Sequence, residues 1–187
     1  SRDRKGFVLS EGGGVVVLAA EEMISGYGLK PKAEVMGIGW TSDAYHFTLP
    51  NPQTIVRAIR DAIDDAGLEP GDIQHVNAHG TSTPKGDATE IECLRTVFGR
   101  SLPMIPVTAN KSQIGHTLGA SAAIEAALGI EAMQQGLLLP TVNHILDPEF
   151  ADIDVVPNRI RRYSYEFFLS NSFGFGGTNC CIVFRGV

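Results

Sequence analysis

Residues 73–84 read Ile-Gln-His-Val-Asn-Ala-His-Gly-Thr-Ser-Thr-Pro, an apolar run followed at once by a polar loop that carries His79. A short apolar run bounded by turn residues is typical of a buried strand. A similar run at 105–108, Ile-Pro-Val-Thr, leads into a loop at 110–116 that ends in His116. Because open α/β sheets bind ligands outside the carboxyl ends of their strands, the two histidine loops predict one shared site.

The rest of the chain predicts helices and strands around these loops. Apolar residues at helical spacing predict helices over about 52–66, 87–98 and 117–135. Asn51 and Pro52 are typical of a helix start, and Gly67 of a helix end. Small residues fill the third helix, so we expect it to be buried on several sides.

Further strands are expected over 7–19, 33–40, 167–171 and 179–184, and a glycine-rich loop joins the last two. The first of them is broken by glycines. Strands interleaved with helices, followed by a terminal strand pair, predict an α/β fold in which a mixed β-sheet is layered with helices.

Composition narrows the class of protein. With 187 residues, 43% of them hydrophobic, the chain is expected to form one domain over residues 1–187. A net charge of -6 and the absence of basic runs argue against a nucleic-acid partner. No run of about 20 apolar residues is present to span a membrane. Three cysteines without framework spacing favour a reducing, cytoplasmic location.

The two loops carry groups suited to carbonyl chemistry. A neutral imidazole donates one hydrogen bond or accepts a proton, so His79 and His116 fit either enolate stabilisation or general-base catalysis. Lys111 fits an orienting role, with Glu125 as its counter-ion. The loop at 173–178 offers backbone N–H groups for an oxyanion hole, although a glycine-rich turn also fits a plain hairpin connection.

Other polar residues are interpreted as structural. His46, His75 and His144 lack a comparable loop context. Zinc binding is disfavoured, because His75 and His79 lie on a strand and its loop rather than on one helix. The three cysteines Cys93, Cys180 and Cys181 are expected to pack rather than to act as nucleophiles.

Three motifs together resemble the β-ketoacyl-acyl-carrier-protein synthases, most closely the type II enzymes of dissociated fatty acid synthesis. They are the stretch 77–83 with Gly86, Asp87 and Glu90; the stretch 111–120 with its Lys-Ser, Gly-His and Gly-Ala pairs; and Asn-Ser-Phe-Gly-Phe-Gly-Gly-Thr-Asn at 171–179. The segments 6–12 and 42–46 also fit. The resemblance covers essentially the whole chain.

The resemblance implies a thiolase-like fold of two stacked halves, of which this chain looks like the C-terminal half. The family's nucleophilic cysteine belongs to the N-terminal half, and no residue here matches its motif. We therefore expect no cofactor, an acyl carrier protein as partner, the missing N-terminal half as a second partner, and a homodimer for the full-length enzyme.

The resemblance also assigns roles to residues. His79 and His116 would hold the malonyl thioester carbonyl and its enolate, with Lys111 orienting the site and Glu125 pairing with it. The N–H of Phe175 would join the oxyanion hole. Thr81, Thr83, Phe173, Gly174 and Phe175 would line the substrate path, with Thr81 and Thr83 on the phosphopantetheine arm and Phe175 as a gate. Which histidine moves a proton stays open.

Two alternatives share these motifs. One is the ketosynthase of a polyketide or other specialised pathway. The other is a catalytically silent chain-length partner, against which the intact His79, His116 and Lys111 argue. Thiolase fits less well, because Cys180-Cys181 does not reproduce the setting of its C-terminal cysteine.

Overall fold

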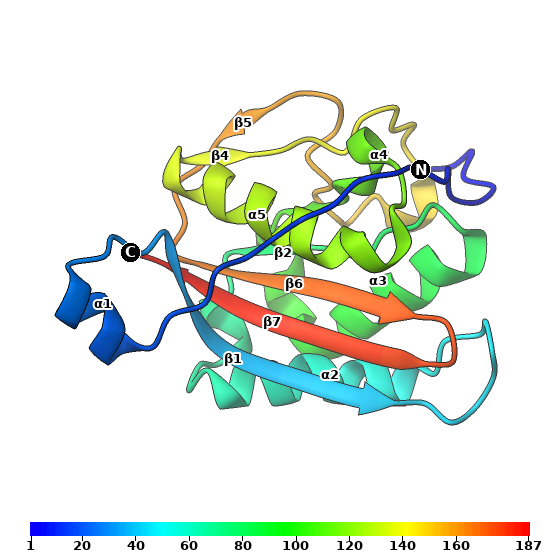
Figure 1. Cartoon of the computed structure of the whole chain (residues 1–187). Coiled ribbons are helices and arrows are strands. Elements are labelled where there is room, and N and C mark those ends of the chain that lie inside the picture. The colour runs from blue at the N-terminus through cyan, green and yellow to red at the C-terminus, as the bar shows by residue number, and fades with distance from the viewer.

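A mixed five-stranded sheet organises the chain, and the computed structural model describes all of residues 1–187 (Figure 1). Its strands are β1 (Ala33–Ser42), β2 (His75–Asn77), β3 (Val107–Thr108), β6 (Phe167–Gly174) and β7 (Thr178–Gly186), in the order β1-β7-β6-β2-β3. Strand β2 runs parallel to both β3 and β6, whereas β7 is antiparallel to β1 and to β6. A small second sheet pairs β4 (Leu137–Leu138) with β5 (Arg161–Arg162). The predicted mixed α/β fold is confirmed.

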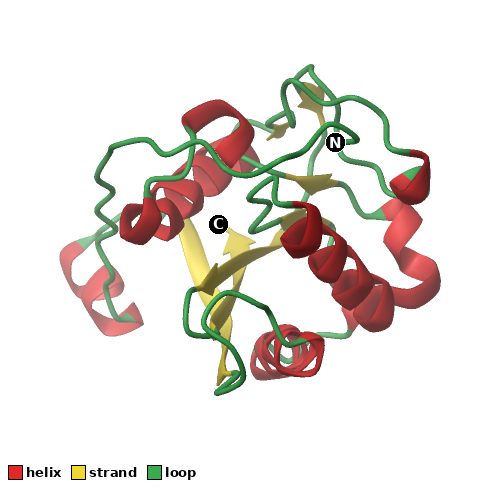
Figure 2. Cartoon of the chain, turned by 90° about the vertical axis from the view of Figure 1, so that its right-hand side faces the viewer, coloured by secondary structure: helices red, strands yellow, loops and turns green.

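Helices cover both faces of the large sheet (Figures 1 and 2). On one face lie α2 (Pro52–Asp65) and α3 (Pro84–Phe98), whose Ile59 and Leu94 belong to a large buried core with Leu169 and Val183 of the sheet. On the other face lies α5 (Ser121–Gln134), packed on Phe168 and Phe184. None of the helices is long and apolar enough to span a membrane.

Shorter helical segments connect these layers. The α-helices α1 (Glu21–Tyr27) and α4 (Lys111–Ile114) are each at most two turns long, and α4 lies inside the second histidine loop. Four 3₁₀ segments complete the chain: η1 (Pro70–Asp72), η2 (Gly99–Met104), η3 (Leu118–Ala120) and η4 (Pro148–Phe150).

Helix α2 approaches the sheet closely because β1 carries glycine where they touch. A Cβ atom on Gly39 would lie 1.8 Å from the carbonyl oxygen of Ala58, and one on Gly37 would lie 2.3 Å from that of Ala62. Real Cβ atoms do not approach other atoms so closely. These two glycines therefore set the distance between helix and sheet.

The strand predicted over 7–19 is wrong. That segment runs extended across α5 (Figure 1), and its only strand-like contact is an isolated bridge between Leu9 and His116. No backbone N–H from Glu11 to Ala19 donates a backbone hydrogen bond, and Val15 and Val17 are almost fully exposed. A strand needs a neighbouring strand for its backbone groups, and the chain offers none here.

The helix predicted over 117–135 begins later, at Ser121, because residues 118–120 form the 3₁₀ turn η3. The expectation that it is buried on several sides holds in part, because the sheet covers one side and residues 12–14 cross another. Its Ala126, Gly129 and Met133 are buried against the sheet, whereas Ala122 and Ala127 are exposed. The small residues permit close packing on the sheet side and also beneath residues 12–14, where a Cβ atom on Gly14 would lie 2.8 Å from the backbone nitrogen of Ile124.

Candidate active site

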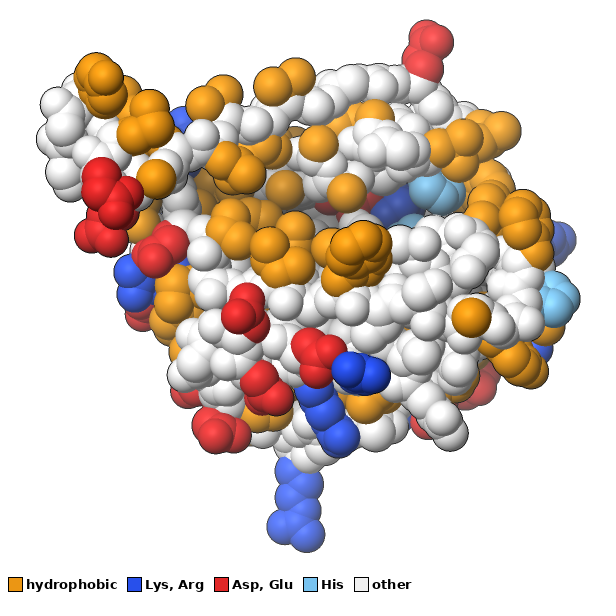
Figure 3. All heavy atoms as spheres, turned by 60° about the horizontal axis from the view of Figure 1, so that its bottom comes forward, with side chains coloured by type: hydrophobic (Ala, Val, Ile, Leu, Met, Phe, Trp, Pro, Cys, Tyr) orange, Lys and Arg blue, Asp and Glu red, His pale blue; other side chains and the backbone are white.

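The two histidine loops meet at one edge of the sheet. Strands β2 and β3 are parallel neighbours, so the loops that follow them leave the sheet on the same side. The imidazole rings of His79 and His116 lie 5.8 Å apart between centroids, with their planes at 84°. Both rings line a cavity of about 760 Å³, which we call the histidine cavity. Figure 3 shows hydrophobic side chains gathered around a hollow in which histidine and basic side chains are visible.

Hydrogen bonds fix the proton position on both rings. The backbone N–H of Phe173 donates to Nδ1 of His79 at 3.3 Å, and that of Leu118 donates to Nδ1 of His116 at 3.2 Å. The hydroxyl of Ser121 also lies 3.1 Å from Nδ1 of His116. A neutral imidazole that accepts at Nδ1 carries its proton on Nε2. Each ring therefore keeps an Nε2–H as its donor.

The surroundings keep both rings neutral. Burial, and then the charges of Lys111 and His116, hold the pKa of His79 well below its usual value. Burial and the charge of Lys111 lower the pKa of His116. At neutral pH the site consequently offers two uncharged N–H donors rather than two cations.

Lys111 and Glu125 form a buried ion pair, with Nζ 2.5 Å from Oε1. Their side chains are 5% and 0% exposed. The side-chain amide of Asn77 donates to the other carboxylate oxygen of Glu125 at 3.0 Å and to Ser170 at 3.2 Å. The predicted pairing is present, and this network ties the end of β2 and the middle of β6 to α4 and α5.

Glu90 was named in the sequence motif without a role, and the structure places it under the first histidine loop. Its buried carboxylate accepts the N–H groups of His79 at 2.8 Å and Gly80 at 2.9 Å, and the amide of Asn171 at 3.1 Å. Glu90 and Leu94 are one turn apart on the buried side of α3. In the sequence, the signal for a structural role of Glu90 is an acidic residue that falls within the buried apolar stripe of α3.

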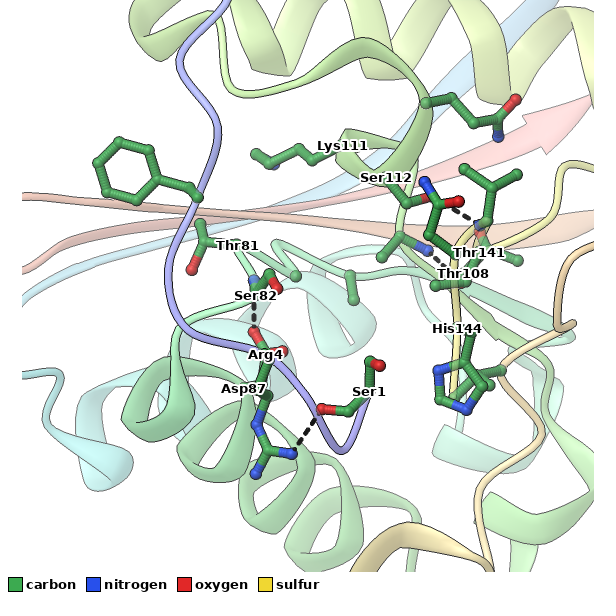
Figure 4. A pocket seen from close by; sticks show the side chains of 18 of the residues that line it. Ser1, Arg4, Thr81, Ser82, Asp87, Thr108, Lys111, Ser112, Thr141 and His144 are labelled. Carbon is green, nitrogen blue, oxygen red and sulfur yellow. Dashed lines mark hydrogen bonds between the residues drawn. The ribbon is translucent and has the colours of Figure 1, made fainter. Parts of the chain in front are cut away.

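Thr81 and Thr83 line the histidine cavity. Thr83 caps α3, where its hydroxyl accepts the N–H of Gly86 at 3.2 Å and lies 3.1 Å from the hydroxyl of Thr81. Thr81 and His116 also line a neighbouring cavity of about 510 Å³. Figure 4 shows Thr81 and Lys111 beside that neighbouring cavity, with Ser82 bonded to Asp87.

The glycine-rich loop is a tighter turn than the sequence predicts, because β6 and β7 extend to Gly174 and Thr178. Phe173, Gly174 and Phe175 all line the histidine cavity. Phe175 is 57% exposed, and its backbone N–H donates no hydrogen bond within the chain. That N–H is available to a ligand.

A second loop, residues 43–50, supports this turn and was not assigned a role from the sequence. The ring of Phe47 stacks on that of Phe175 with centroids 5.8 Å apart, and the carbonyl of Phe47 accepts the N–H of Gly176 at 2.8 Å. The carboxylate of Asp43 accepts the amide of Asn179 at 2.7 Å. The two loops therefore form one wall of the histidine cavity.

Of the residues interpreted as structural, His75, Cys93 and Cys181 line neither cavity, whereas His46 and Cys180 line the histidine cavity. His75 is buried with Nε2 2.8 Å from the hydroxyl of Thr108. Burial raises the pKa of all three thiols, that of Cys93 to about 12. No group of three histidine, cysteine, aspartate or glutamate side chains is placed to hold a metal ion.

Comparison with known proteins agrees with this architecture. Residues 32–144 match the model of the family described as "Beta-ketoacyl synthase, C-terminal domain". The chain is 42% identical over 185 residues to 3-oxoacyl-[acyl-carrier-protein] synthase 2 of Staphylococcus aureus, covering 97% of this chain and 46% of that protein. It is 41% identical to the enzyme of the same name from Synechocystis, covering 98% of this chain and 45% of that protein.

Solved ketosynthase structures are also similar to this chain. The ishigamide ketosynthase/chain length factor superposes with a TM-score of 0.94 at 37% identity, covering 100% of this chain and 46% of that one. A β-ketoacyl synthase from Burkholderia phymatum superposes with a TM-score of 0.83 at 40% identity, covering 89% of this chain and 40% of that one.

The fold and the paired loops thus define a ketosynthase C-terminal domain. The chain belongs to the β-ketoacyl synthase family, with synthase 2 enzymes among its relatives. It spans a little under half the length of the curated relatives it matches.

Proposed function

We propose that residues 1–187 act as the C-terminal half of a β-ketoacyl-acyl-carrier-protein synthase and supply the two-histidine part of its condensation site. The observation that carries this proposal is the pair of neutral imidazoles in one cavity, each with Nδ1 occupied and Nε2–H free. Two converging donors fit a carbonyl oxygen that gains negative charge during a reaction.

The proposed step is decarboxylation of a malonyl thioester. The bond between the α-carbon and the carboxylate breaks, carbon dioxide leaves, and the electron pair moves through the α-carbon onto the thioester oxygen. The Nε2–H groups of His79 and His116 stabilise that enolate oxygen. The α-carbon then attacks an acyl thioester, whose sulfur leaves. Lys111 and Glu125 hold the histidine loops, and burial, together with the charge of Lys111, lowers the pKa of both rings and keeps them neutral.

The acyl group is carried on a cysteine that the other half of the enzyme supplies. None of the chain's own thiols has the lowered pKa of an activated nucleophile. The free N–H of Phe175 stabilises the oxyanion formed when that cysteine takes the acyl group. Thr81, Thr83, Phe173 and Gly174 line the path of the substrate arm.

The partners proposed are an acyl carrier protein, the other half of the enzyme and a second copy of the whole enzyme, in the cytoplasm. One similar solved structure, at 34% identity with a TM-score of 0.94, is titled as a type II polyketide acyl carrier protein in complex with its ketosynthase bound to the hexaketide. The chemistry needs no cofactor beyond the phosphopantetheine that the carrier brings.

A second candidate function is condensation in a polyketide or specialised lipid pathway. The close superposition on the ishigamide ketosynthase/chain length factor favours it. A purely chain-length-shaping role would not require the Nε2–H pair or its Lys111–Glu125 support. Product analysis with malonyl-carrier protein, one elongation against several, distinguishes fatty acid from polyketide synthesis.

The direct test compares the 187-residue chain with a full-length protein that contains it, using acyl- and malonyl-carrier protein. We expect β-ketoacyl product from the full-length protein and none from the chain alone. Turnover by the purified chain would contradict the division of the site between two halves. No product from the full-length protein with any acyl length would contradict the proposed function.

A further inference from the structure

Lys85 stands at the exposed end of a row of residues that begins at His79. His79, Thr81, Thr83 and Lys85 all line the histidine cavity, whereas Gly80 and Ser82 between them line the neighbouring cavity instead. Positive φ angles at Gly80 and Ser82, 45° and 64°, accompany this alternation. One wall of the histidine cavity therefore presents an imidazole, two hydroxyls and an ammonium in sequence order.

Lys85 has no partner within the chain. It is exposed, takes part in none of the ion pairs, and is the only lysine or arginine that lines the histidine cavity. It is the second residue of α3, where the helix dipole disfavours a positive charge. The stability of α3 gives no reason for a lysine at this position.

The only carboxylate lining the same cavity leaves Lys85 free as well. Asp43 accepts the N–H of Asn51 at 2.9 Å, the amide of Asn179 at 2.7 Å and the hydroxyl of Thr54. Asp43 and Lys85 are the two charged residues that line the cavity, and only Asp43 is engaged by hydrogen bonds from the chain, so the ammonium of Lys85 is the charge left available to a ligand. The cavity therefore favours a substrate that is polar along its length and anionic at its outer end.

We propose that Lys85 binds the phosphate of the phosphopantetheine arm, an inference that rests on the proposed function. The arm carries its groups in the order thioester carbonyl, two amides and phosphate. The wall carries matching groups in the same order: an N–H donor at His79, hydroxyls at Thr81 and Thr83, and an ammonium at Lys85. Lys85 lies six positions after His79, so the Cα atoms of the two residues are at most about 20 Å apart, which limits the length of arm that the row can bind. Lys85 is thus a residue that selects phosphorylated over unphosphorylated arms.

The test measures binding of 4′-phosphopantetheine and of pantetheine, which lacks the phosphate, to a full-length protein that contains residues 1–187, by isothermal titration calorimetry. Lys85→Ala is expected to weaken 4′-phosphopantetheine binding about fivefold and to leave pantetheine binding unchanged. Lys85→Arg should restore the preference, and added salt should reduce it. Lys30→Ala, which removes an exposed lysine outside the histidine cavity, is the matched control.

The possible outcomes distinguish the role of Lys85 from the proposed function on which it rests. Equal binding of both compounds by the unmodified protein, or equal losses for both in Lys85→Ala, would overturn the role of Lys85 and leave the proposed function standing. Binding of neither compound, by a protein that unfolds cooperatively, would contradict the arm-binding site itself and with it the proposed function. Loss of carrier-protein binding without loss of 4′-phosphopantetheine binding would assign Lys85 to the carrier's acidic surface and overturn the proposal.

Discussion

His75 and His79 lie four residues apart, but His75 is buried whereas His79 is only partly buried and lines a cavity. His79 has a free Nε2–H at a cavity, whereas His75 packs edge-on against Tyr165 and bonds Thr108. Burial lowers the pKa of His75 to about 3. The sequence analysis distinguished the two because only His79 follows the strand end, and the structure places only His79 at the cavity.

The low pKa of His75 predicts a loss of stability in acid. The unfolded chain binds a proton near pH 6.5 and the folded chain does not until about pH 3, so stability is complete above 6.5 and falls as the pH drops through that window. At pH 5 this group alone should cost about 2 kcal/mol. Urea unfolding at pH 7 and pH 5 measures it.

Other groups also titrate in this window, so the comparison is with His75→Gln, which keeps a polar side chain but does not titrate. The variant should lose about 2 kcal/mol less than the wild type between the two pH values. Equal losses would show that His75 is not buried in its neutral form.

Glu90 supports the first histidine loop by accepting two of its backbone N–H groups, and its replacement tests that support. Glu90→Gln exchanges one acceptor oxygen for an N–H₂ that faces backbone N–H donors. We expect a loss of about 2–3 kcal/mol in unfolding free energy, because buried donors lose their acceptor. Glu92→Gln, on the exposed side of the same helix, should change stability by less than about 1 kcal/mol. Similar effects of the two changes would remove Glu90 from this role.

At the scale of elements, local signals predicted well and non-local ones did not. Helix α2 was predicted because Asn51, Pro52 and its apolar stripe are all local, and the side chain of Asn51 does accept the N–H of Gln53. The segment 7–19 was misjudged because valine-rich composition cannot supply the neighbouring strand that β structure needs. Phe47 and Phe175 stack although they are 128 positions apart, and no local sequence pattern predicts such a contact.

The glycines of β1 give a sharp prediction at this scale. Gly39→Ala places a Cβ atom 1.8 Å from the carbonyl of Ala58, so α2 must move away from the sheet. We expect a loss of about 3 kcal/mol or more in thermal or urea unfolding. Gly71→Ala, at a position with open space, should change stability by less than about 1 kcal/mol. A Gly39→Ala protein as stable as the wild type would contradict the close helix–sheet contact.

Many large apolar side chains are exposed on the surface of the molecule. Val8, Leu9, Val15, Val17, Leu18, Trp40 and Phe47 are all more than 60% exposed, and Figure 3 shows hydrophobic side chains gathered on one face. Large exposed apolar patches mark interfaces. This is the surface on which we propose that the other half of the enzyme lies.

We therefore expect the 187-residue chain to associate when it is purified alone. Light scattering across a concentration series should show oligomers, and association should fall when the other half is co-expressed. A monodisperse monomer at all concentrations would count against a missing cover.

The division of labour between the histidines and the glycine-rich turn is the central claim, and one pair of measurements tests it in the full-length enzyme. Carbon dioxide release from malonyl-carrier protein and formation of radiolabelled acyl-enzyme are followed separately in His79→Ala and His116→Ala. Decarboxylation should fall about 10²–10³-fold in both variants, since each loses a donor to the enolate. Acylation should survive better, because its oxyanion uses the backbone N–H of Phe175. A fall in acylation as large as the fall in decarboxylation, in both variants, would contradict the account.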